Sequence, residues 1–348
     1  MSTLPPGKLS SKLLAQLLGT QTLPDEVLLG PQPGEDGCAI ALGNGVLVAA
    51  TDPITLVGSD IGKFAVYINA NDIAVMGVSP RWFLASVLLP PGTTSGDAER
   101  LFDALREALA HVGGTLVGGH TEVTSAVRQP VVVGQMLGYS PSGHFVRTGG
   151  LEVGHSVLQV GQAPVEGAAV LAGRASAEHS SPEGIDPETL AAARAAVERP
   201  GILVVEPALI AAEHGASALH DPTEGGLATG LWEMAETSGV RLDIASKKVQ
   251  WFSAGCRLCE HYGLDPWGTL ASGCLLVGVR PVNERALTET LQHTGYRVSV
   301  LATATPGSGV YIDGTLAPRF ERDELSRLDD APPETARSAD SAPVEHGT

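Results

Sequence analysis

Aromatic and basic residues are both scarce in this chain. Phe, Trp and Tyr make up only 4% of its 348 residues, so Ala, Val, Leu and Ile have to build the cores. Only 22 Lys and Arg stand against 39 Asp and Glu, which gives a formal net charge of -17. A surface of this sign repels nucleic acids and anionic membranes, so we expect neither as a natural partner.

Cysteine is rare as well, and no long apolar run occurs. The four cysteines are too few for a disulfide framework in a chain of this length. Cys256 and Cys259 form a lone C-x-x-C without a second pair to complete a zinc site, and we expect small buried helical residues there. No apolar stretch approaches the roughly 20 residues that span a bilayer, and the N-terminus shows no secretory pattern. These features predict a cytoplasmic protein.

Several common catalytic motifs are missing. No G-x-G-x-x-G follows a strand, which leaves a dinucleotide-binding fold unsupported, and neither G-x-S-x-G nor H-E-x-x-H occurs. The segment GSDIGKF is similar to a phosphate-binding P-loop. However, Val57 stands where that motif needs Gly, and Phe64 stands where it needs Ser or Thr. A P-loop nucleotide site is therefore excluded.

The residues that are abundant favour two α/β or α+β domains. The chain is 43% hydrophobic, with 42 Gly, 24 Pro and short Val-rich runs. We expect an N-terminal arm at 1–30, a first domain at 31–150, a second domain at 151–328 and a disordered Pro- and acid-rich tail at 329–348.

Hydrophobic periodicity predicts the individual elements. In the first domain we expect a hairpin of two strands around GNG, a buried helix near 63–77, a strand at 81–90, a helix at 95–114 and strands at 115–123 and 129–140. Ser95 is the expected N-cap of the helix at 95–114, and Gly113 follows its end. A short helix precedes Gly19. The second domain is expected to contain helices near 187–198 and 205–214 and strands near 274–280, 297–302 and 309–312.

The helix YINANDIAVMG is apolar on nearly every side, yet it contains Asn69, Asn71 and Asp72. An ionised carboxylate without a partner in such a helix would cost several kcal/mol or more. Asp72 must therefore face a compensating group, either an arginine such as Arg81 or a cation.

Three further aspartates stand in comparable contexts. Asp36 lies in the Gly-flanked turn GEDG, Asp52 follows the strand VLVAAT, and Asp221 opens the loop HDPTEGG before a helix. Taken singly they read as a turn former, a strand-end cap and a helix cap. Because Asp36, Asp52 and Asp72 fall in consecutive elements, Mg²⁺ shared with phosphate oxygens would compensate all of them together.

Glycine-rich turns could supply the other half of a nucleotide site. GEDG, VGGHTEV and TEGGLATG each let backbone N–H groups approach an anion, and the last precedes a helix. Within VGGHTEV, His120 could be a ligand, a phosphate contact or a general base, and Glu122 could share that work. His220, beside Asp221, is more consistent with a structural role.

The ordered set GEDGCAI, TDPIT, DIGKFAV, NANDIAVMGVSP, LVGGHTEV, HDPTEGGLATGLWEMAE and ASGCLLVG resembles the aminoimidazole ribonucleotide (AIR) synthetase superfamily over about residues 30–320. Its members include the purine-pathway synthetase, the hydrogenase maturation factor HypE, selenophosphate synthetase and thiamine monophosphate kinase. The resemblance implies a PurM-like fold. In this fold an N-terminal mixed-sheet domain dimerises through its sheet, a C-terminal α+β domain follows, and ATP lies in a long cleft.

The resemblance also implies the site. Asp36, Asp52, Asp72 and Asp221 would hold Mg²⁺, and His120 and Glu122 would be the catalytic pair. The residues expected to contact the nucleotide are Gly34, Asn71, Gly118, Gly119, Thr121, Thr223, Gly225 and Gly226.

The implied activity is transfer of phosphate from ATP to an amide- or carboxyl-type oxygen of a small molecule or a partner protein, such as a metalloenzyme-maturation partner, with release of ADP. Two departures keep alternatives open. HypE ends in a modified cysteine, whereas no cysteine follows Cys274 here, and HypE and thiamine monophosphate kinase carry an acid where His120 stands. An ATP-binding scaffold with little turnover and a small-molecule kinase are therefore the alternatives.

Overall fold

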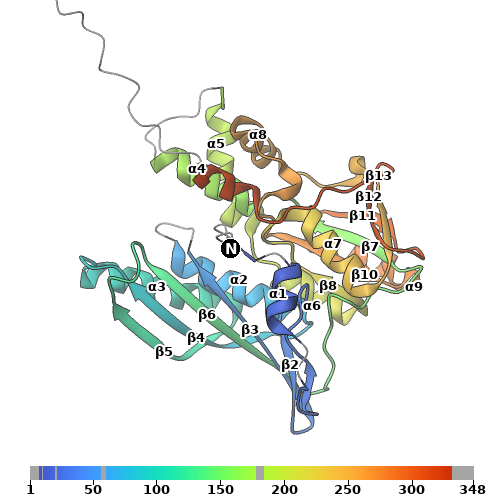
Figure 1. Ribbon diagram of the computed structural model, residues 1–348, viewed down its shortest axis with the longest axis horizontal. Coiled ribbons are helices and arrows are strands. Elements are labelled where there is room, and N and C mark those ends of the chain that lie inside the picture. Colours follow the sequence, from blue (N-terminus) through green and yellow to red (C-terminus); the bar gives the residue numbers. More distant parts are fainter. Residues whose placement is uncertain (1–7, 10, 20–21, 56–59, 178–183, 331–348) are drawn as a thin grey trace, which may run out of the picture.

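The computed structural model describes residues 8–9, 11–19, 22–55, 60–177 and 184–330. Within these residues the chain forms an N-terminal half on one six-stranded sheet and a C-terminal half with two smaller sheets (Figure 1). The mixed α/β class predicted from the sequence is confirmed.

The first half alternates strands and helices. Its elements are α1 (Ser11–Leu18), β1 (Val27–Leu29), β2 (Cys38–Leu42), β3 (Gly45–Ile54), α2 (Ile61–Val75), β4 (Pro80–Leu89), α3 (Ser95–Val112), β5 (Thr115–Val123) and β6 (Val131–Ser140). The strand order in the sheet is β1-β2-β3-β6-β4-β5, and all neighbours are antiparallel except the parallel pair β4 and β5. The elements of the first half, including the short helix α1 expected in the N-terminal arm, follow the sequence pattern closely.

Helix α3 shows how local chemistry fixes an element boundary. Its N-cap is Thr94, not the expected Ser95. The Asp97 N–H donates to the Thr94 hydroxyl, and the Thr94 N–H donates to the Asp97 carboxylate, which completes a capping box. At the other end Gly113 adopts the left-handed conformation and closes the helix as predicted.

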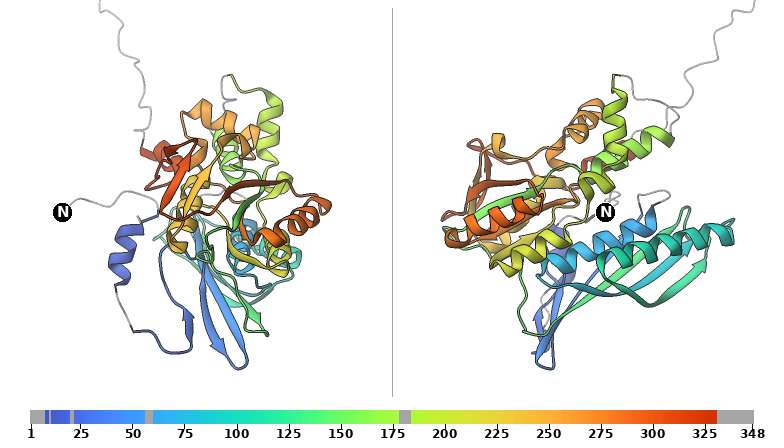
Figure 2. Two further views of the ribbon diagram at one scale, coloured as in Figure 1. Left: turned by 90° about the vertical axis from the view of Figure 1, so that its right-hand side faces the viewer. Right: turned by 180° about the vertical axis from the view of Figure 1, so that it is seen from behind.

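Helix α2 is the buried helix that the sequence predicted. Every residue in it except Lys63 is buried. It packs on β3 and β6 below, beside α3, and against α6 of the second half. Figures 1 and 2 show α2 and α3 on the same face of the sheet, toward the second half, while no helix of the described residues covers the opposite face. The all-round apolar pattern of α2 is explained by these contacts on three sides.

The second half contains two sheets surrounded by helices. Its elements are β7 (Ser156–Gly161), α4 (Glu166–Ala177), α5 (Pro187–Arg194), α6 (Val205–Glu213), β8 (Ala216–His220), α7 (Gly226–Ser238), β9 (Arg241–Ile244), α8 (Ser253–Tyr262), β10 (Cys274–Val279), α9 (Pro281–His293), β11 (Val298–Thr303), β12 (Gly309–Ile312), β13 (Thr315–Leu316) and α10 (Arg327–Asp330). One sheet has the antiparallel order β11-β7-β10-β8 and the other the order β13-β12-β9. The expected strands near 274, 297 and 309 are confirmed.

The end of α5 differs from the expected helix, and the environment of the C-x-x-C agrees with its expected packing role. The helix expected at 187–198 ends at Arg194, and a π-helical turn over Val197–Gly201 follows it. The C-x-x-C lies on α8, where burial raises the pKa of Cys256 to about 11 and that of Cys259 to about 12. These thiols stay protonated at neutral pH, in agreement with small packing residues.

One apolar core runs through both halves. It joins residues of the first sheet, α2 and α3 to residues of α4, α5, α6 and β10. Among the described residues, no helix combines the length and the apolar character needed to cross a bilayer. The tail expected at 329–348 lies outside the described residues, apart from the two positions that end α10.

Candidate active site

Four elements carry the four aspartates to the junction of the two halves. Asp36 lies in the loop before β2, Asp52 near the end of β3, Asp72 within α2, and Asp221 directly after β8. Because residues alternate along a strand, Asp52 shares the helix-covered face with the buried Val48 and Ala50. The aspartates that the sequence singled out therefore approach the same region from both halves.

The backbone of Asp52 is fixed by Asn69 of α2. The Asp52 N–H donates to Asn69 Oδ1 at 2.9 Å, and Asn69 Nδ2 donates to the Ala65 carbonyl at 2.8 Å. Gly134, the partner of Asp52 on β6, makes room for this amide, because a Cβ there would lie 2.5 Å from Asn69 Nδ2. The strand position of Asp52 is thus coupled to α2.

Asp72 lies buried in the interior, beside the other acids. Its side chain is 6% exposed, and within the described residues no hydrogen bond or ion pair reaches its carboxylate. Burial raises its pKa well above the usual range, the charges of Asp52, Asp221 and Asp36 raise it further, and the charge of Lys8 opposes them. The alternative partner Arg81 does not serve, since its guanidinium lies 4.8 Å from the centre of the Trp82 ring.

The Asp221 carboxylate is also buried, and it lacks hydrogen-bond partners. Both of its carboxylate oxygens are buried and accept no hydrogen bond. It is not the cap of α7, whose N-cap is Gly225. Burial raises the pKa of Asp221 well above the usual range, Asp36 and Asp52 add to this, and His220 opposes it. A buried carboxylate with no hydrogen-bond donor fits a cation ligand.

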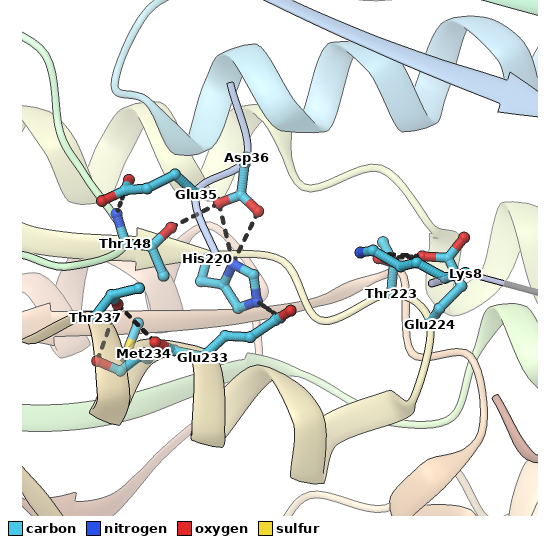
Figure 3. A network of polar contacts seen from close by, with 10 residues as sticks. All are labelled: Lys8, Glu35, Asp36, Thr148, His220, Thr223, Glu224, Glu233, Met234 and Thr237. Carbon is cyan, nitrogen blue, oxygen red and sulfur yellow. Dashed lines mark hydrogen bonds and ion pairs between the residues drawn. The ribbon is translucent and has the colours of Figure 1, made fainter. Parts of the chain in front are cut away.

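Asp36 belongs to a chain of three charged groups (Figure 3). His220 Nδ1 lies 2.9 Å from Oδ1 and 3.0 Å from Oδ2 of Asp36, and His220 Nε2 lies 3.0 Å from Oε2 of Glu233. Burial alone would lower the pKa of His220, but Asp36 and Glu233 raise it well above its usual range. His220 is therefore an imidazolium that donates to both carboxylates, which agrees with the structural role expected for it.

The link between the two halves holds the GEDG turn. The Thr148 hydroxyl donates to Asp36 Oδ2 at 3.0 Å, and the Thr148 N–H donates to Glu35 at 3.1 Å (Figure 3). The Arg147 guanidinium also donates to Glu35, at 2.9 and 3.1 Å. Asp36 and its neighbour Glu35 are thus positioned by residues of the link and not by the sheet alone.

The donor set fits a hard divalent cation, because it consists of carboxylates that raise one another's pKa. Burial and Glu224 raise the pKa of Asp52 to about 6, against the opposing charge of Lys8. Within the described residues, however, no three His, Cys, Asp or Glu side chains lie close enough to form a finished metal site. The acids converge, but they would have to draw closer around an ion.

The half-exposed Lys8 brings a positive charge to this acidic region. Its Nζ lies 3.8 Å from Glu224 Oε2, on the loop before α7 (Figure 3). Burial lowers the pKa of Lys8, but the charges of Glu224, Glu233, Asp52 and Asp36 raise it overall. The N-terminal arm therefore partly neutralises the cluster.

The glycine turns are formed as expected, although their N–H groups have partners. Gly225 and Gly226 both have positive φ angles, which the turn before α7 requires. The Gly225 N–H donates to Asp323 at 2.9 Å, and the Gly226 N–H donates to the Thr223 carbonyl at 3.0 Å. Gly34, also at positive φ, packs against Glu233 and Thr237. A phosphate at the α7 turn would have to displace Asp323.

Asn71 is fully buried and connects the two halves. Its Nδ2 donates to the Ile202 carbonyl at 2.9 Å, and its Oδ1 accepts from the Val204 N–H at 2.8 Å. These contacts explain why an amide stands in the buried helix. A direct nucleotide contact by Asn71 stays a prediction.

The LVGGHTEV strand lies apart from the four aspartates of the same chain. The sheet register aligns Asp52 with Gly134, Ala85 and Gly119 on successive strands, so β5 is roughly 14 Å away. Because residues alternate along β5, His120 lies on the face of the sheet opposite to Asp52. Glu122 lies on the same face as His120, and His120 Nε2 is 3.3 Å from Glu122 Oε2. The strand is an exposed edge that carries Gly118, Gly119, His120, Thr121 and Glu122.

Three residues near the site were not singled out from the sequence. Glu166 begins α4, Ser272 precedes β10, and Asp323 lies on the C-terminal segment that reaches the α7 turn. Burial raises the pKa of Asp323 to about 7. Only the burial of isolated acids within apolar segments could have marked Glu166, and Ser272 lies in the ASGCLLVG motif without being singled out there.

The fold and the acidic junction define a two-domain protein of the PurM-like type. Residues 34–140 match the N-terminal domain and residues 152–314 the C-terminal domain of the AIR synthase related protein family. This chain belongs to the AIR synthase-related family, and its relatives include HypE-like proteins.

Three relatives illustrate the family's range. A hydrogenase expression/formation protein of Methanocaldococcus jannaschii is 28% identical over 84% of this chain and 86% of its own. Carbamoyl dehydratase HypE of Cupriavidus necator is 30% identical over 67% of this chain and 65% of its own. Thiamine-monophosphate kinase of Mycobacterium tuberculosis is 29% identical over 75% and 76%.

Solved structures show the same fold. HypE in a HypE–HypF complex superposes with a TM-score of 0.68 at 22% identity, covering 83% of this chain and 93% of its own. HypE in complex with ATP superposes with a TM-score of 0.67 at 20% identity, covering 88% and 90%. The PurM-like architecture implied by the sequence is confirmed.

Proposed function

We propose that this protein binds MgATP at the junction of its halves and transfers the γ-phosphoryl group to an amide- or carboxyl-type oxygen of an acceptor, with release of ADP. The observation that carries the proposal is Asp221, whose two buried carboxylate oxygens accept no hydrogen bond, together with the buried Asp72, whose pKa the other acids raise. A cation would satisfy both.

The relatives support this choice of chemistry. Carbamoyl dehydratase and a phosphate-transferring kinase both occur among proteins about 30% identical to this chain, and HypE has been solved with ATP. In the proposed step the acceptor oxygen forms a bond to the γ-phosphorus while the bond to the bridging oxygen of ADP breaks. Catalysis of this kind depends mainly on positioning and charge neutralisation.

The chain's own residues have distinct parts in this proposal. Asp52, Asp72 and Asp221 would hold Mg²⁺, and Asp36 would add a fourth carboxylate. Mg²⁺ bound there supplies charge neutralisation for the phosphate oxygens. His220 fixes the orientation of Asp36 and prevents its charge from adding to that of Glu233. Since Asp72 and Asp221 belong to different halves, cation binding would strengthen their association.

We further propose that the protein is a homodimer that associates through the uncovered face of the first sheet. That face carries the half-buried side chains of Leu84, Leu88, Val131 and Val133, and β5 forms its exposed edge. His120 and Glu122 point to this face, so they would act at a nucleotide only if a second copy brought them to its site. Light scattering tests this, since a monomeric mass would exclude a catalytic role for the pair.

Thermal unfolding tests the proposed function. Saturating MgATP should raise the melting temperature by several degrees, because a ligand at 100 times its Kd adds about 2.7 kcal/mol to stability. Asp72→Asn should lose this increase. Asp103→Asn, which changes an exposed acid on α3, should retain it. A wild-type protein whose unfolding does not respond to millimolar MgATP would contradict the proposal.

A second candidate is a small-molecule kinase, favoured by the thiamine-monophosphate kinase relative. The products discriminate the two: a kinase leaves a phosphorylated acceptor, whereas a dehydratase-like enzyme releases inorganic phosphate. If purified protein binds ATP but releases no ADP, alone or with a maturation partner, the scaffold alternative holds instead.

A further inference from the structure

A groove on the outside of the molecule is separate from the acidic junction. It lies between the C-terminal end of α3 and one face of α6, and its volume is about 450 Å³. This volume is within the roughly 300–1,000 Å³ of known binding pockets. None of the residues that line the groove is a proposed metal ligand or nucleotide contact. The groove therefore needs an occupant of its own.

The floor of the groove is apolar, although α6 already has a packed face. The residues 207, 208 and 211 of α6 are buried, and the helix contacts α2, β8 and α9. The groove is lined by the opposite face of the helix, because positions 205, 209 and 210 lie about half a turn away from the packed residues. Leu209 and Ile210 on this face are only half-buried, and Leu203 before α6 and Val112 at the end of α3 extend the apolar floor.

The acidic residues of the groove stand one at each end of α6. Glu206 and Glu213 are exposed, and because they are seven residues apart they lie on the same side of the helix, about 10 Å from each other. Glu206 accepts a hydrogen bond from the Tyr296 hydroxyl at 2.7 Å, and within the described residues neither acid has a basic partner. The groove thus offers two acceptors with an apolar surface between them.

The rest of the lining has the same electrostatic preference. Among the described residues that line the groove, none is Lys or Arg. His111 and Val112 are the last two residues of α3, so the carbonyl end of that helix adds partial negative charge. An occupant with a cationic edge and an apolar face is complementary to this surface.

We propose that this groove is a docking site for a basic amphipathic helix of a partner protein. Apolar residues three or four positions apart on such a helix would pack on Leu209, Ile210 and Val112. Two lysines or arginines seven positions apart would reach Glu206 and Glu213, because both helices repeat at the same spacing. A second copy of this chain is disfavoured as the occupant, since its formal net charge is -17 and like charges repel.

The inference goes beyond the proposed function, because docking in the groove requires neither ATP nor Mg²⁺. The groove is nevertheless connected to α2 through the backbone. Leu203 and Val205 flank Val204, and the Val204 N–H donates to Asn71 Oδ1 at 2.8 Å. A helix in the groove would therefore contact the segment to which α2 is tied.

Fluorescence polarisation with a labelled synthetic peptide tests the docking site. The probe is a helical peptide of about 18 residues, with apolar residues at helical spacing and two lysines seven positions apart. Its reference is a peptide of the same composition in scrambled order, which reports attraction to the acidic chain in general. Wild type should bind the probe about ten-fold more tightly than the scrambled peptide. Raising the salt concentration from about 0.05 M to about 0.5 M should weaken binding of the probe several-fold.

Two substitutions separate the charge of the groove from its apolar contact. Glu213→Lys should weaken binding of the probe about ten-fold, because attraction is replaced by repulsion. Leu209→Ser should weaken it several-fold through lost apolar contact. Glu99→Lys is the matched control, since it makes the same charge change at an exposed position near the other end of α3 and should bind as wild type does. A peptide with glutamates in place of the two lysines should bind Glu213→Lys more tightly than it binds wild type.

The proposal is overturned if the scrambled peptide binds as well as the probe, or if Glu213→Lys and Leu209→Ser both leave the affinity for the probe unchanged. Circular dichroism separates loss of binding from loss of folding, and Glu213→Lys, at an exposed position, decides the case if Leu209→Ser does not fold. A wild-type dimer that Glu213→Lys dissociates in light scattering would assign the groove to a second copy and would also overturn the proposal.

The outcome is independent of the nucleotide site. Binding of the probe in EDTA and without ATP would support the docking site even if MgATP failed to stabilise the protein. Stabilisation by MgATP without binding of the probe would remove the docking site and leave the proposed function intact.

Discussion

Replacing Asp52 by Asn should stabilise the metal-free protein in a pH-dependent manner. The folded environment raises the pKa of Asp52 from 3.8 to about 6, through burial and the charge of Glu224. An acid with a raised pKa contributes stability that is present below the unfolded value and lost as the pH rises through the folded value. Asn is nearly isosteric and carries no charge, so it does not suffer this loss.

The magnitude follows from the two pKa values. One pH unit corresponds to 1.36 kcal/mol, so a difference of about two units destabilises wild type by at most about 3 kcal/mol at pH 7.5. At pH 4.5 the ionisation of Asp52 favours the unfolded chain less strongly, and the loss of folding stability is about 1 kcal/mol. Asp52→Asn should therefore gain about 3 kcal/mol at pH 7.5, or roughly 4 °C in melting temperature for a chain of this size.

The assay is unfolding of both proteins in EDTA at pH 4.5 and 7.5, repeated with Mg²⁺. Magnesium should stabilise wild type and reverse the order at pH 7.5, because Asn is a weaker ligand for a hard cation. Asp103→Asn, at an exposed ion pair on α3, should change stability by less than about 1 kcal/mol at either pH. If Asp52→Asn is no more stable than wild type at pH 7.5, Asp52 is not buried beside other acids, and its place in the acidic junction is wrong.

Two further substitutions test the supports of the site. Asn71→Ala leaves the Ile202 carbonyl and the Val204 N–H buried without partners, so the free energy of unfolding measured in urea should fall by about 3 kcal/mol. An unchanged free energy of unfolding would show that Asn71 does not link the two halves. His220→Asn leaves Asp36 and Glu233 without their shared cation and should cost about 3–5 kcal/mol. Because the pKa of His220 is raised, the loss of folding stability in this variant should be largest below pH 6.5 and should shrink only as the pH rises above it. A loss that grows with pH would contradict a protonated His220.

Local pattern was sufficient for most elements. The apolar positions of α2, the GNG hairpin and Gly113 after α3 depend on neighbours in sequence, and the structure has them as expected. Asp36, Asp52 and Asp72 were grouped from the sequence because acids in consecutive elements would need shared compensation, whereas Asp221 joined them only through the family resemblance. The burial of Asp72 could thus be expected from its apolar neighbours, and its role as a metal ligand stays a prediction.

Features that depend on residues distant in the sequence could not be predicted from local patterns. Asn71 bonds to backbone more than a hundred residues away, so its linking role has no local signature. The face of β5 on which His120 lies follows from strand order and register, which no short motif encodes. Glu166 and Ser272 meet only across the folded second half, and neither lies in a pattern that predicts their proximity.

Neighbouring positions on α2 perform different tasks: Asn71 ties the helix to residues 202–204, and the next side chain, Asp72, turns toward the acids. Any displacement of α6 relative to the first sheet must therefore alter the spacing between Asp72 and Asp221. Substitutions in the α6 segment, which carries none of the proposed ligands, should consequently change how tightly magnesium is held. A search for such long-range mutants would measure how stiffly one half of the molecule transmits its position to the other.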